Sequence, residues 1–192
     1  MSSVHVIGNL ANLVWITIPF FKRKSEYFYF FVVTAVPGIY QFISMHVLHI
    51  TSSPIVIPYS LLLIPSLYKS FFKSNIIVLS LAGLIAFPVF YTVDGNIHQI
   101  FCLFIHIAVL IILASRTTNI ALTTGKLNIF TLLLLLYELS MVVKLIPIVK
   151  ADLNSIELYM LTTIFQIFVG LFFTYAKEDN PKLIIKLSSP DL

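Results

Sequence analysis

One glutamate and one histidine stand deep inside long apolar stretches, where ionisable side chains are costly. Glu138 lies within the apolar run 127–149, and His106 lies within the preceding run, 97–115. A carboxylate in hydrocarbon must be paired, hydrated or protonated, and imidazole takes up a proton near neutral pH. The pattern therefore predicts one of two arrangements. Either Glu138 and His106 share a proton and respond to pH, or a neutral Glu138 makes a single hydrogen bond that holds two helices together.

Two glutamines lie at the same expected depth as this pair. Counting about 1.5 Å per residue from the outer end of each run places four polar residues roughly 13–17 Å deep. These are Gln41, His106, Glu138 and Gln166, and Asn12 is slightly shallower. Because they come from separate runs, the layer predicts a buried hydrogen-bonded network or the floor of a ligand pocket.

A lysine lies six residues nearer the outer end of the run that contains Glu138. At 3.6 residues per helical turn, Glu138 and Lys144 fall on different faces, so we expect no pairing between them. The sequence favours a Lys144 side chain that extends toward the outer interface. The alternative is a cation that faces an anionic ligand in an outward-open cavity.

Histidines and the single cysteine gather toward the outer ends of the runs. His46 and His49 are three positions apart, and His98, Cys102 and His106 follow at four-residue steps, so each set shares a helical face. Imidazole and thiolate bind zinc, copper or haem iron. No H-E-x-x-H or C-x-x-C sequence accompanies them. We therefore treat His46, His49, His98 and Cys102 as weak metal candidates and expect no cofactor.

The elements that must position these residues are apolar helices. Of the 192 residues, 59% are hydrophobic and 10% are charged, whereas soluble domains carry about 25% charged residues. Runs of about 20 apolar residues predict membrane-spanning helices. Seven runs are present: 4–21, 27–50, 54–72, 75–93, 97–115, 127–149 and 156–176. The sequence predicts an all-α integral membrane protein, with a seven-helix domain over 1–176 and a short tail over 177–192.

The distribution of basic residues predicts the orientation of this bundle. With the N-terminus outside, ten lysines and arginines fall on the cytoplasmic side and Lys150 falls outside, as the positive-inside rule requires. No basic residue precedes the first run, so it is a first helix and not a cleaved leader. We expect a cytoplasmic C-terminus and a place in the plasma (inner) membrane. The basic residues flank apolar runs, so the charge does not indicate nucleic-acid binding.

Catalytic motifs such as a G-x-S-x-G elbow or a phosphate-binding glycine loop are absent from the sequence, which argues against an enzyme. The leading hypothesis is a small membrane sensor or ligand-binding module that acts through a partner protein. Its cytoplasmic contact surfaces would be the loop from Arg116 to Lys126 and the C-terminal tail. The alternatives are a small transporter or channel that uses the Glu/His layer, a structural subunit of a membrane complex, and a membrane enzyme using His and Glu.

Overall fold

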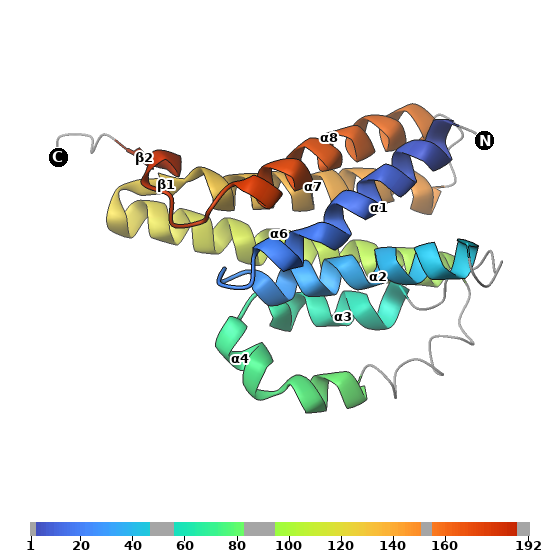
Figure 1. Cartoon of the computed structure of the whole chain (residues 1–192), viewed down its shortest axis with the longest axis horizontal. Coiled ribbons are helices and arrows are strands. Elements are labelled where there is room, and N and C mark those ends of the chain that lie inside the picture. The colour runs from blue at the N-terminus through green and yellow to red at the C-terminus, as the bar shows by residue number, and fades with distance from the viewer. Residues whose placement is uncertain (1–2, 47–55, 83–94, 151–154, 188–192) are drawn as a thin grey trace.

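The computed structural model describes the backbone of residues 3–46, 56–82, 95–150 and 155–187, and it is a bundle of helices (Figure 1). The helices are α1 (Ser3–Phe21), α2 (Phe28–His46), α3 (Val56–Ser66), α4 (Lys69–Ser74), α6 (Gly95–Thr124), α7 (Ile129–Lys150) and α8 (Ser155–Tyr175). Residues 76–82 are also helical. The prediction of a helical fold is confirmed, and its physical reason is that only intrahelical bonds satisfy the backbone of an isolated segment in lipid.

Among the residues that the structure describes, three helical segments are long and apolar enough to cross a membrane: Ile97–Thr124, Ile129–Pro147 and Ile156–Tyr175. Two shorter apolar helical segments, Val6–Phe21 and Phe28–Tyr40, accompany them. Large apolar side chains on these helices lie on the outside of the bundle, as Phe104 (65% exposed) and Phe168 (67% exposed) illustrate. Such a surface is compatible with lipid and unfavourable in water, so the protein is membrane-associated.

The bundle packs around an aromatic core. α1 contacts both α2 and α8, while α7 contacts α6 and α8. Trp15 of α1 stacks on Tyr137 of α7 with ring centroids 3.9 Å apart, and the rings of Phe130 and Phe173 lie 4.8 Å apart. Aromatic side chains from α1, α7 and α8 therefore meet at one centre, which fixes how these helices face one another.

The segment from Arg116 to Lys126, predicted to be a loop, is mostly helix. α6 continues to Thr124 and has 30 residues, which at 1.5 Å per residue is about 45 Å. No proline or glycine interrupts it, and the Thr117 and Thr124 hydroxyls donate to helix carbonyls four positions earlier. The helix ends at Gly125, whose φ of 63° is a left-handed conformation that glycine adopts readily.

The third predicted run is divided, because α3 ends at Ser66 and α4 begins at Lys69. In Figure 1, α4 and the helical residues 76–82 lie below the bundle. Of the fourth run, 75–93, only residues 75–82 are among those described. The number of seven spans therefore stays a prediction.

A small sheet joins the C-terminal tail to the start of α7, and this was not predicted. β1 (Lys126–Asn128) pairs antiparallel with β2 (Ile184–Lys186), and Leu127 lies opposite Ile185. A short 3-10 helix, η1 (Pro181–Leu183), precedes β2. Part of the tail is therefore folded against the end of the bundle.

A polar network joins the residues that follow α1 to the residues that follow α8. We call this end of the bundle, where Lys22 lies, the basic end. The buried Lys22 ammonium donates to the carbonyl of Ala176, just after α8. The Glu178 carboxylate accepts from the Ser25 hydroxyl at 2.5 Å and from the Glu26 backbone N–H at 3.0 Å. Burial lowers the pKa of Lys22, and the Glu178 carboxylate opposes that shift.

The same network reaches the middle of the chain. Arg116 of α6 forms an ion pair with Glu26, and the Lys69 ammonium donates to the Ser25 carbonyl at 2.9 Å. The Asn128 side chain donates to the Glu178 carbonyl at 3.0 Å. Lysines and arginines that the sequence assigns to one side of the membrane thus bind partners at one end of the molecule.

Replacing Gly170 with alanine is expected to lower stability by about 1–3 kcal/mol, because it overpacks the contact between α1 and α8. A Cβ at position 170 would lie 2.7 Å from Val14 Cγ1 and 3.2 Å from Trp15 Nε1. Thermal unfolding in detergent measures the effect. Gly8→Ala is the matched control, since its Cβ meets only the Tyr159 hydroxyl, at 3.8 Å. Equal melting temperatures for the two variants would contradict the prediction.

Candidate functional site

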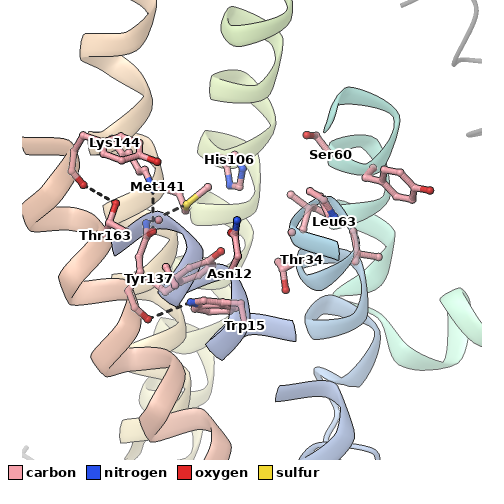
Figure 2. Close-up of a pocket in the computed structure, with 18 of the residues that line it drawn as sticks. Asn12, Trp15, Thr34, Ser60, Leu63, His106, Tyr137, Met141, Lys144 and Thr163 are labelled. Carbon is pink, nitrogen blue, oxygen red and sulfur yellow. Dashed lines mark hydrogen bonds between the residues drawn. The ribbon is translucent and has the colours of Figure 1, made fainter. Parts of the chain in front are cut away.

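A cavity of about 410 Å³ lies where α1, α2, α3, α6, α7 and α8 converge, and Figure 2 shows its wall. One part of this wall is apolar and aromatic, with Trp15, Val33, Leu63 and Tyr137. The remainder carries polar side chains, including Asn12, Thr34, Ser60, His106, Lys144, Thr163 and Gln166. A cavity of this size with a few converging polar groups is typical of a small-molecule site.

His106 and Glu138 form a buried pair beside this cavity. His106 Nδ1 lies 2.7 Å from Glu138 Oε2, and the residues are 6% and 0% exposed. His106 contributes to the cavity wall, whereas Glu138 is not among the lining residues. A carboxylate behind an imidazole fixes the orientation of the ring and the proton between Nδ1 and Oε2. The expected contact between the two residues is thus present.

The second oxygen of Glu138 is unusual. Oε1 is buried and has no hydrogen-bond partner among the described residues. A buried, unsatisfied polar atom is costly in a native protein and calls for a specific explanation.

Lys144 and Gln166 form the second polar contact of the cavity. The Lys144 ammonium donates to Gln166 Oε1 at 3.3 Å and lies 4.2 Å from the centroid of the Tyr159 ring. Gln166 Nε2 donates to Ser140 Oγ at 3.0 Å and contacts Met141 Sδ at 3.1 Å, which turns the amide oxygen toward the lysine. Figure 2 shows Lys144 on the cavity wall. The Lys144 ammonium therefore lies on the cavity wall, beside Gln166 and Tyr159. That it faces an anionic ligand stays a prediction.

Trp15 connects three helices at the floor of the site, and sequence reasoning missed it. Its indole N–H donates to the backbone carbonyl of Gln166 at 3.1 Å, and its ring stacks on Tyr137. Two sequence signals were available. Asn12 and Trp15 are three positions apart and share a helical face, and Tyr137 directly precedes Glu138.

The structure thus brings together His106, Glu138, Lys144 and Gln166 around one cavity, as two hydrogen-bonded pairs. Gln41 belongs to α2, but its side chain lies outside the described part of the structure. Whether these residues bind a ligand or a proton stays a prediction.

The weak metal candidates do not assemble into a site among the residues that the structure describes. Cys102 Sγ lies 3.3 Å from Ser60 Oγ, and His98 lies one helical turn earlier on α6. Position 49 and the side chain of His46 lie outside the described residues. Within the described ranges, no three His, Cys, Asp or Glu side chains come together to hold a metal ion.

Comparisons with protein-family models, with curated proteins and with solved structures found no match.

Proposed function

We propose that this chain is a membrane sensor or ligand-binding module that takes a small molecule into the cavity between its helices. The observation that carries the proposal is the cavity itself, where polar side chains from six helices converge on an aromatic wall. A bundle that only needed to pack would fill such a space with apolar side chains. Binding energy from the ligand would then depend on the relative positions of all six helices, which is what a sensor requires.

We further propose that the bundle has seven spans in the plasma membrane, with its N-terminus outside and its C-terminus in the cytoplasm. The positive-inside distribution supports this orientation. An odd number of spans is supported by the positions of α1's first residues and β2, which lie at opposite ends of the bundle (Figure 1). Fusion of green fluorescent protein and of alkaline phosphatase to the C-terminus tests it. Phosphatase activity with no fluorescence would refute the orientation.

Output through a partner protein is part of the same proposal. The last turns of α6 and the tail around β2 are the surfaces that we assign to it. They carry exposed apolar side chains outside the bundle core, among them Leu122 (81% exposed) and Ile185 (44% exposed). Apolar side chains exposed beyond the membrane favour contact with protein.

Native mass spectrometry of the gently solubilised protein tests ligand binding first. A co-purified small molecule, released when the protein is unfolded, is the expected result. The only tryptophan of the chain lies on the cavity wall, so occupancy should also shift its emission. A protein of bare mass, whose Trp15 emission no added compound changes, would refute the proposal.

A small transporter is the second candidate, and the buried Glu138–His106 pair with its unsatisfied oxygen favours it. Ionisable residues inside membranes commonly mark proton pathways. Proteoliposomes that contain a pH-sensitive dye distinguish the two candidates. Proton movement coupled to ligand addition, abolished by Glu138→Gln, would support transport. Ligand binding without such movement would support the sensor.

A further inference from the structure

The described residues of the cavity wall include a cation but no carboxylate. Lys144 lines the cavity, whereas no aspartate or glutamate is among the described residues that do so. The nearest acid on its own helix, Glu138, is fully buried and paired with His106. The wall of the cavity therefore has a positive charge without a matching negative one.

The groups that surround the Lys144 ammonium are neutral. Within the described part of the chain, its only hydrogen-bond acceptor is Gln166 Oε1, at 3.3 Å, and its other close contact is the face of Tyr159. No carboxylate lies within ion-pair distance of it there, since the described ion pairs are His106–Glu138 and Arg116–Glu26. An ammonium has three donors, so the Lys144 ammonium can donate a further hydrogen bond to an anionic group in the cavity.

The site is built to hold the ammonium in place. Ser140 and Met141 fix the amide of Gln166, and Thr163 bonds to the backbone carbonyl of Tyr159 at 2.6 Å. The side chain of Lys144 thus rests between an oriented amide oxygen and an aromatic face. A fixed donor loses little freedom when an anion binds, and this favours affinity.

We propose that the ligand of this cavity is a small organic carboxylate, with its anionic group on Lys144 and its apolar body along Trp15 and Tyr137. This inference rests on the proposed function and names its ligand class. A body is required because the wall also carries apolar and aromatic side chains, among them Trp15, Leu63 and Tyr137, and an inorganic ion would leave these side chains uncovered. A single ammonium matches the single negative charge of a carboxylate, whereas a phosphate monoester carries a charge of about −1.5 to −2 at pH 7 and would leave part of it without a partner.

Three probes with the same body and different charge test the assignment: phenylacetate, phenylacetamide and phenethylamine. Trp15 emission of the full-length protein in lipid nanodiscs is the measure of binding. We expect phenylacetate to bind about tenfold or more tightly than phenylacetamide, which corresponds to one charge-assisted hydrogen bond of about 1.4 kcal/mol. Phenethylamine should bind most weakly, because its ammonium would face Lys144.

Variants of Lys144 distinguish the effect of losing its charge from the effect of a folding defect. Lys144→Met keeps an unbranched side chain and should remove the preference, so that phenylacetate binds no more tightly than phenylacetamide. Lys144→Arg should retain the preference for the carboxylate. Retained phenylacetamide binding and an unchanged melting temperature show that the cavity and the fold are intact, so a folding defect cannot imitate the expected result.

A second experiment distinguishes a carboxylate that comes from the lipid from one that comes from solution. In it, oleate is added to the lipid of the nanodiscs. Binding of oleate alone assigns a lipid-derived carboxylate, and binding of phenylacetate assigns a soluble one; both support the assignment. Equal affinity for phenylacetate and phenylacetamide, or phenylacetate binding that survives Lys144→Met, overturns it and leaves the proposed function standing. Lack of response to every probe also overturns it, and native mass spectrometry then decides the proposed function separately.

Discussion

Glu138→Ala is expected to lower the stability of the bundle by about 3–5 kcal/mol, the range for breaking a buried pair and leaving one member unpartnered. His106 Nδ1, now 2.7 Å from Glu138 Oε2, would lose its partner in a site where Glu138 is 0% exposed. Polar contacts between membrane helices often contribute less, about 0.6 kcal/mol on average. We expect the higher range because the pair is ionisable and its residues are only 6% and 0% exposed. Thermal unfolding in detergent provides the measurement.

Glu157→Ala is the control for this variant. Glu157 is exposed in the first turn of α8, and its loss should change stability by no more than about 0.5 kcal/mol. A double-mutant cycle with His106→Ala then measures the pair directly. Strong non-additivity is expected, because either single substitution already breaks the contact. Simple addition of the two losses would show that the residues are near each other but not energetically coupled.

Trp15→Ala is expected to be equally damaging, at about 3–5 kcal/mol, the usual cost of truncating a buried aromatic residue. Trp15 is 7% exposed, stacks on Tyr137 and donates to the Gln166 carbonyl. Trp15→Phe should cost about 1 kcal/mol, because an aromatic ring remains and one hydrogen bond is lost. Loss of helical circular dichroism on heating measures both variants without the tryptophan signal.

Phe20→Ala is the matched control on the same helix. Phe20 is 66% exposed on the outside of α1. In a membrane, such a side chain contacts lipid whether or not the helices are associated, so its removal should have little effect on the bundle. A loss as large as that of Trp15→Ala would mean that Phe20 is covered by another copy or by a partner.

The contact between His106 and Glu138 was predictable from the sequence because each residue is isolated in an apolar run. Helical rise alone placed His106 opposite Glu138, and they are in contact. The pairing of Lys144 with Gln166 was not predictable, because it depends on how α7 and α8 are rotated about their axes. A rotation of this kind is set by packing at the aromatic core, which no local pattern reveals.

The end of α6 and the small sheet were missed for a different reason. Arg116, the threonines and Asn119 were taken as a break in an apolar run, although none of them stops a helix. The helix stops at Gly125, which has a left-handed backbone conformation. The pairing of β1 with β2 joins segments about 58 positions apart, and strands of three residues carry no pattern long enough to predict such pairing.

The network at the basic end has a consequence for how the chain is made. Lys22 and the carbonyl of Ala176 are 154 positions apart, and Ser25 and Glu178 are 153 apart. Synthesis proceeds from the N-terminus, so the first two helices are complete long before these partners exist. During that interval Lys22 must keep its charge hydrated at the membrane surface, and it can be buried only when α8 arrives. Closure of this end is therefore a late step in biogenesis, and a ribosome stalled before residue 176 would carry a bundle whose first loop is still open to solvent.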